Sequence, residues 1–106
     1  MHLPTDAVIT REKLTLYLLV PRRKNDKSRF LAQAGFSLEN PDVLEVALRR
    51  LIAEHEAISD REDAYGVYYR VEGNLHGPDG ILRVITIWIR LHADGTIRFV
   101  TLKPVR

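Results

Sequence analysis

The sequence predicts an α+β fold in which two to three N-terminal helices pack on a four-stranded antiparallel sheet. Apolar residues recur with helical spacing as far as His55, and the period changes toward alternation beyond it. The later segments are joined by short turns, which suit antiparallel neighbours and leave no room for crossover helices. A length of 106 residues fits a single domain spanning residues 1–106.

The first predicted helix begins after Thr10, a favourable N-cap, and covers residues 11–19 before Pro21 ends it. Its apolar stripe consists of Leu14, Tyr17 and Leu18. A second, shorter helix is expected over residues 27–34, followed by Gly35 at a position that favours a left-handed residue. Its inward residues are expected to be Phe30, Leu31 and Ala34.

The third helix has the clearest signals, because Asn40 can cap it, Pro41 suits its first turn and Asp42 complements its dipole. We expect it to end near His55. Its buried stripe is predicted to be Leu44, Ala47, Leu48, Leu51 and Ile52.

Strands are predicted over residues 57–61, 67–72, 81–91 and 96–103. Turns are expected at residues 65–66 and 93–95, and residues 76–80 have the composition of a loop. The strand over residues 81–91 is so apolar that we expect it to be central and covered on both faces.

Composition excludes several classes of protein. The chain has no cysteine, which rules out a disulfide scaffold and a thiolate zinc site. No apolar run reaches the roughly 20 residues that span a bilayer, and the N-terminus lacks the features of a secretion signal, so a cytoplasmic protein without a membrane partner is expected. The four histidines show no ligand spacing and no phosphate-binding or nucleophile motif is present, so no metal and no cofactor is predicted.

The net charge of +2 is unevenly distributed, with nine Lys/Arg against six Asp/Glu in residues 1–50. The most basic stretch is residues 21–30, where only Asp26 opposes the cations. These cations are Arg22, Arg23, Lys24, Lys27 and Arg29. Such a cluster attracts phosphate, although a solvated loop is the simpler reading of a single basic segment.

Polar residues within the predicted sheet are the other candidates for a site. Thr86 shares a strand face with Leu82, Val84 and Trp88, and the last strand places Thr101 and Lys103 on one face. A cross-strand threonine pair can be purely structural. Arg83, among isoleucines, needs a partner or an anionic ligand unless its side chain extends to the sheet edge.

Metal-independent cleavage of RNA needs few groups. One helps to remove the 2′-hydroxyl proton, cations stabilise the phosphorane, and an acid protonates the leaving 5′-oxygen. Lys, Arg, Thr and Tyr can divide these roles without histidine. The basic segment lying against a sheet that carries Thr86, Thr101 and Lys103 would supply such a site.

Seven short stretches resemble, in order, motifs of a group of small bacterial toxin domains. They are residues 11–19 ("K-L-x-x-Y-L-L-N"), 27–30 ("K-A-R-F"), 34–36 ("L-G-F/Y"), 65–71 ("Y-G-x-x-Y-x-V"), 77–80 ("G-P-N-G"), 83–89 ("R-V-R-T-x-W-I") and 98–101 ("R-L-V-T"). Members stand beside a small partner gene or form the C-terminal tip of polymorphic and contact-dependent toxins. The group resembles the barnase–EndoU–colicin–RelE superfamily, whose characterised relatives are ribonucleases, often against tRNA.

The resemblance implies catalytic roles for Lys27, Arg83, Thr86 and Thr101. RNA would be bound by Arg22, Arg23, Lys24, Arg29 and Lys103. The chain departs from the pattern at Ile85, where an Arg is usual, at Asp79, where Asn is usual, and over residues 22–26, which lack the Gly and His often found there. A missing cation at position 85 would have to be replaced by Arg83, Arg90 or Lys103.

Two hypotheses from different classes follow. The first is the toxin of a bacterial toxin–antitoxin pair, a ribonuclease acting on RNA such as tRNA and restrained by a small cognate antitoxin or immunity protein. The second is a non-catalytic module of the same fold that binds RNA or a protein. A structural or regulatory domain with a solvated basic loop is the remaining alternative.

Overall fold

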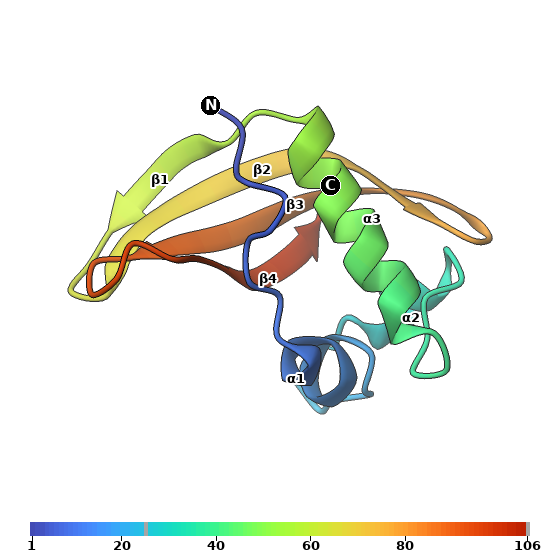
Figure 1. Cartoon of the computed structure of the whole chain (residues 1–106). Coiled ribbons are helices and arrows are strands. Elements are labelled where there is room, and N and C mark those ends of the chain that lie inside the picture. The colour runs from blue at the N-terminus through green and yellow to red at the C-terminus, as the bar shows by residue number, and fades with distance from the viewer. Residues whose placement is uncertain (25, 106) are drawn as a thin grey trace.

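In the computed structural model, which describes residues 1–24 and 26–105, a helical first half precedes a four-stranded sheet (Figure 1). The elements are α1 (Arg11–Lys13), η1 (Leu14–Leu18), α2 (Ser28–Ala32), α3 (Pro41–Glu54), β1 (Ile58–Glu62), β2 (Gly66–Gly77), β3 (Gly80–Leu91) and β4 (Ile97–Pro104). The strands lie in the order β1-β2-β3-β4, and every neighbouring pair is antiparallel. The predicted α+β fold is therefore confirmed.

Helix α3 crosses one face of the sheet and forms the core with it (Figure 1). The whole predicted stripe of α3, from Leu44 to Ile52, is buried. From the sheet, Val71, Val84, Trp88 and Leu102 are fully buried against the same cluster. Asn40 precedes the helix as expected, but its side chain accepts from Ser37 N at 2.8 Å and donates to Gly35 O at 3.1 Å, so it closes the preceding loop and does not cap α3.

The first helix is not a regular α-helix. Thr10 caps α1 as predicted, but the chain then widens into the π-helical turn η1, in which Leu19 N donates to Leu14 O at 3.0 Å. The Thr15 hydroxyl donates to Arg11 O at 3.0 Å, a side-chain contact that competes with the regular ladder. Leu14 and Leu18 remain fully buried, whereas Tyr17 is half-buried.

The predicted loop over residues 76–80 is wrong. Strands β2 and β3 pair continuously from Gly66 with Leu91 to Gly77 with Gly80, so only Pro78 and Asp79 form the turn. Long-range pairing thus overrides the local turn signals of this stretch. The tip of the hairpin docks on the end of α2, where Asp79 N donates to Ala34 O at 2.9 Å.

The expectation that β3 is covered on both faces is also wrong. The strand is interior, and Val84, Thr86 and Trp88 face the core. On the opposite, outer face, Ile85 and Ile87 are only half-buried and Ile81 is 58% exposed. An antiparallel sheet with helices on a single side leaves its second face toward solvent.

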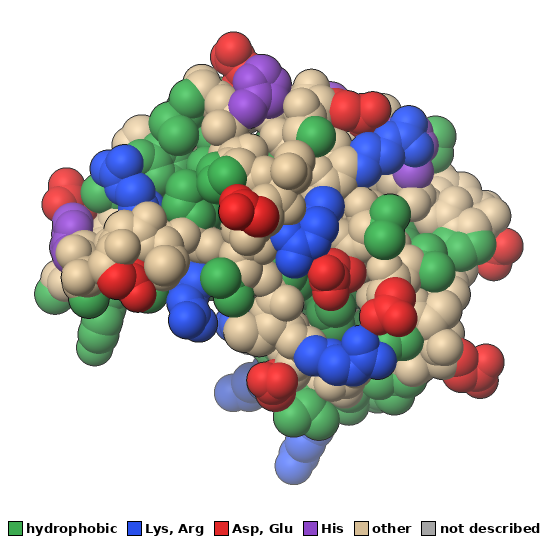
Figure 2. All heavy atoms as spheres, viewed as in Figure 1, with side chains coloured by type: hydrophobic (Ala, Val, Ile, Leu, Met, Phe, Trp, Pro, Cys, Tyr) green, Lys and Arg blue, Asp and Glu red, His purple; other side chains and the backbone are tan. Residues whose placement is uncertain are grey.

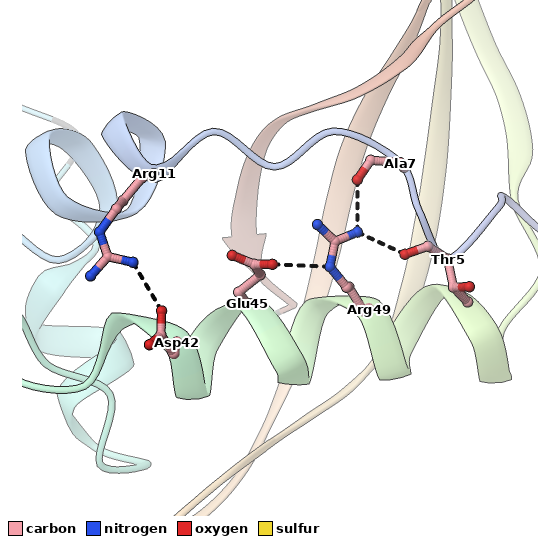
Figure 3. A network of polar contacts seen from close by, with 6 residues as sticks. All are labelled: Thr5, Ala7, Arg11, Asp42, Glu45 and Arg49. Carbon is pink, nitrogen blue, oxygen red and sulfur yellow. Dashed lines mark hydrogen bonds and ion pairs between the residues drawn. The ribbon is translucent and has the colours of Figure 1, made fainter.

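The N-terminal segment before α1 is part of the fold. Leu3, Ala7 and Ile9 are buried, and Val8 forms a parallel bridge beside Arg98 on the outer edge of β4. Arg49 of α3 holds this segment, because its Nη1 donates to Thr5 O and to Ala7 O, each at 2.7 Å (Figure 3). Its Nε also pairs with Glu45 at 3.1 Å.

Replacing Arg49 with methionine should destabilise the protein by about 2 kcal/mol, since hydrogen bonds from a charged donor contribute roughly 1.5–3 kcal/mol and this side chain is only 30% exposed. Chemical denaturation measures the change, and hydrogen exchange should show faster exchange of the Val8 amide, which donates to Ile97 O. Arg50→Met is the control, because Arg50 pairs with Glu54 on the exposed side of α3. Equal effects of the two substitutions would contradict this role.

Candidate active site

A lysine and a threonine separated by 74 residues in the sequence meet beside β4. The Nζ of Lys27 donates to the Thr101 hydroxyl at 3.3 Å. Lys27 immediately precedes α2, whose start is fixed by Asp26, a carboxylate that accepts from Ser28 N at 2.8 Å and from its hydroxyl at 2.6 Å. These hydrogen bonds lower the pKa of Asp26, so the carboxylate is ionised and held within its own loop.

Tyr17 completes the cluster. Its ring is flanked by two cations, with Arg22 Cζ at 4.6 Å and Lys13 Nζ at 5.4 Å from the ring centroid. A hydrogen bond with Thr101 is the largest cause that lowers the pKa of Tyr17, and the charges of Lys27, Arg22 and Lys13 lower it further while partial burial opposes them. The tyrosine lies in the π-helical turn η1, a local form that is frequent at functional sites.

The basic segment continues this cluster outward. Arg22, Arg23 and Lys24 line a shallow open hollow of about 580 Å³, and all three are exposed. In Figure 2, Lys and Arg side chains project from the bottom edge of the molecule, below the place of α1 in Figure 1. Arg22 belongs to both the hollow and the surroundings of Tyr17, so the two features form one positively charged region.

Two further predicted RNA-binding residues lie around this region. Arg29 is exposed on α2, where its charge acts on Asp26. Lys103 is exposed on β4, two residues beyond Thr101, and alternation places both on the outer face of the sheet.

The structure does not bring Thr86 to the cluster. Thr86 pairs with Leu102 and Thr101 pairs with Ile87, so the two threonines point to opposite faces of the sheet. Thr86 is 0% exposed, donates to Val71 O at 2.9 Å and accepts from Trp88 Nε1 at 2.8 Å. Its hydroxyl is fully used inside the core.

Replacing Thr86 with valine should therefore act on stability. The change leaves the Trp88 indole N–H buried without its acceptor, which costs about 1–3 kcal/mol. Urea denaturation measures the loss. Thr86→Ser, which keeps the hydroxyl, should lose less, and Thr101→Val, at a half-buried edge position, should leave stability nearly unchanged. A neutral Thr86→Val would show that the hydroxyl does not support the core.

Arg83 also lies apart from the cluster. Its guanidinium pairs with Glu72 at 3.2 Å and with Asn74 at 3.4 Å on the outer face. Thr101 is opposite Ile87, four residues further along β3, which corresponds to roughly 13 Å. Arg90, the other arginine of β3, lies over the ring of Tyr69 at 5.8 Å.

No histidine is among the described residues that form this cluster. His76 lies in β2 and lines a groove with Val43 and Val46 of α3. Within residues 1–24 and 26–105, no three His, Asp or Glu side chains are grouped so as to hold a metal ion. Among the same residues, no helix has the length and apolarity that crossing a membrane requires.

Tyr17 is the member of the cluster that sequence reasoning did not select. Its helical spacing placed it in an apolar stripe. Lys13 precedes Tyr17 by four residues, and this spacing alone indicated that a cation would lie beside the ring. Its contact with Thr101 depends on how η1 lies against β4.

The fold and this cluster define a class of small α+β domain with a tyrosine and several cations beside the last strand of an antiparallel sheet. The chain belongs to the family described as a domain of unknown function, DUF6883, whose model matches residues 4–106. No curated protein matches the sequence.

Among solved structures, the chain is similar to a chain of the contact-dependent growth inhibition toxin–immunity protein complex from Klebsiella pneumoniae 342. The TM-score is 0.65 at 19% sequence identity, and the match covers 95% of each chain. This likeness establishes a shared fold.

Proposed function

We propose that this protein is the toxin of a bacterial toxin–antitoxin or contact-dependent inhibition pair and that it cleaves RNA without a metal ion. The observation that carries the proposal is the contact of Lys27 with Thr101 beside Tyr17, at the inner end of the basic segment. The similar fold in a toxin–immunity protein complex supports the toxin role. The resemblance to the barnase–EndoU–colicin–RelE superfamily supports the ribonuclease chemistry.

In this proposal the RNA backbone follows the basic segment and places the scissile phosphate against Lys27 and Thr101. Arg22, Arg23 and Lys24 attract the flanking phosphates, a contact that depends on salt and is independent of sequence. Lys27 neutralises the charge that develops on the phosphorane, and the Thr101 hydroxyl orients a non-bridging oxygen. A tRNA has the exposed, single-stranded loop that such a shallow region can reach.

A ribonuclease of this kind needs a protein that restrains it in the cell that makes it. We propose a small cognate immunity protein that covers the positively charged region, acting in the cytoplasm where the RNA substrate is found. Electrostatic attraction to such a region would give fast association.

A non-catalytic binding module is the second candidate, and one observation favours it. Ile85 stands where the toxin motif that residues 83–89 resemble has an arginine, and with Ile87 it forms a half-buried apolar row on the outer face of the sheet. A partner protein could cover this row. In that case the protein would bind RNA or a partner protein and would have no ribonuclease activity.

Incubation of the purified protein with total RNA in EDTA tests the proposal. We expect discrete fragments that end in a 2′,3′-cyclic phosphate, and we expect Thr101→Ala to reduce their formation. Intact RNA at a large excess of protein would rule out a metal-independent ribonuclease and leave the binding module. Fragments formed equally by Thr101→Ala would place the site elsewhere.

A further inference from the structure

We infer that Tyr17 is a catalytic residue and that its phenolate removes the 2′-hydroxyl proton during RNA cleavage. The inference rests on the proposed ribonuclease function and adds to it the group that moves the proton. Neither Lys27 nor Thr101 can do this readily. An ammonium has no free lone pair, and a threonine hydroxyl is a weak base.

The position of Tyr17 suits this role. Its ring lies 4.6 Å from Arg22 Cζ and 5.4 Å from Lys13 Nζ, and the Thr101 hydroxyl, which Lys27 Nζ contacts at 3.3 Å, lowers the pKa of its phenol. A phosphate bound by Lys27 and Thr101 therefore has the phenol oxygen beside it. The residue is half-buried, and Lys13 and Arg22 both lie over its ring.

The three cations around Tyr17 favour its anion. Lys13 comes from α1, Arg22 from the basic segment and Lys27 from the start of α2, and β4 contributes the Thr101 hydroxyl. These groups lower the pKa of the phenol, so a larger fraction of phenolate is present near neutral pH than for an ordinary tyrosine. In the proposed step the active form carries the Tyr17 phenolate together with the Lys27 ammonium.

The proposed step balances atoms and charge. The Tyr17 phenolate accepts the 2′-hydroxyl proton as the 2′-oxygen forms a bond to phosphorus. The bond from phosphorus to the 5′-oxygen breaks, and the Lys27 ammonium donates a proton to that oxygen. The products are a 2′,3′-cyclic phosphate and a 5′-hydroxyl, and proton exchange with water restores phenolate and ammonium.

The test compares wild type with Tyr17→Phe under single-turnover conditions across the pH range. The variant should lose cleavage about 100-fold or more, a typical contribution of a positioned base. Binding of a 2′-O-methyl RNA, which cannot be cleaved, should stay within a few-fold. Tyr65→Phe is the matched control, because Tyr65 is 73% exposed in the β1–β2 turn.

A second readout does not depend on cleavage. In an ultraviolet titration one tyrosine should ionise below the usual range, and this step should vanish in Tyr17→Phe and move to higher pH in Thr101→Val. Tyr68 should ionise above the usual range, because its hydrogen bond to Asp63 raises its pKa. Fluorotyrosine at position 17, which keeps the ring and lowers the phenol pKa, should shift the acid limb of the cleavage profile to lower pH.

The outcomes separate the two proposals. Equal cleavage by wild type and Tyr17→Phe, or an unmoved acid limb with fluorotyrosine, would overturn the role of Tyr17 and leave the ribonuclease standing. RNA left intact by wild type would overturn both. If Tyr17→Phe does not fold, the fluorotyrosine profile decides alone.

Discussion

Replacing Lys27 with methionine is expected to lower RNA cleavage by about two to four orders of magnitude and to abolish growth arrest on expression. In the proposed mechanism Lys27 has two roles, as the cation nearest the phosphorane and as the acid that protonates the leaving oxygen, and each contributes on this scale. The measurement is single-turnover cleavage of a defined RNA in EDTA. Stability should change little, because the contact with Thr101 is a single hydrogen bond of 3.3 Å.

Three control substitutions separate the roles of charge, acid and position. Lys27→Arg keeps the cation but cannot give up its proton near neutral pH, so it should restore binding and only part of the cleavage. Lys24→Met, in the same basic segment, should weaken RNA binding a few-fold and leave the bound complex active. Arg50→Met, which removes an exposed pair with Glu54 on α3, should have no effect. Cleavage by Lys27→Met within about fivefold of wild type would contradict the proposed site.

The fold could be predicted from sequence wherever local chemistry and long-range packing agree. For α3, the residues Asn40 and Pro41 and a continuous apolar stripe all indicate the same helix, and the structure confirms it. At the β2–β3 hairpin, local chemistry and long-range packing favour different structures. His76 and Gly77 belong to a turn-rich stretch, yet they pair with Ile81 and Gly80 because the preceding ten residues of β2 already fix the register.

The candidate site could be predicted only in part, and the reason is register. Alternation correctly grouped Thr86 with Val84 and Trp88, but it gave no means of aligning β3 with β4. The ladder shifts between Ile87 and Trp88, where a bulge is accommodated, and Thr101 consequently lies opposite Ile87. Lys27 and Thr101 were both selected through the resemblance, and the contact between them is a finding of the structure.

The π-helical turn η1 could not be predicted from the sequence pattern. A spacing of three and four residues describes an α-helix and a single wide turn equally well over so short a segment. The turn places Leu14 and Leu18 in the core while Tyr17 reaches Thr101 at the edge of the sheet. The contribution of η1 to the site therefore depends on where β4 lies, which the sequence pattern does not give.

Gly77→Ala is expected to destabilise the protein by about 3 kcal/mol, at the upper end of the usual cost of overpacking. A Cβ at this position would lie 2.3 Å from Ala34 O and 2.9 Å from both Ala34 Cβ and Phe36 Cε2. The nearest of these atoms belongs to the backbone, and the same carbonyl accepts the hydrogen bond from Asp79 N, so it cannot move away without losing that bond. Chemical denaturation measures the change.

Gly95→Ala is the matched control, because a Cβ there meets open space and the cost comes only from its φ of +74°, about 1 kcal/mol. Similar losses for the two variants would show that the hairpin does not pack tightly on α2.

The larger loss of stability expected for Gly77→Ala has a consequence for the site. Ala34 follows the helix whose start carries Lys27, so a displaced hairpin should also shift Lys27 from Thr101 and reduce RNA cleavage, whereas Gly95→Ala should leave cleavage unchanged.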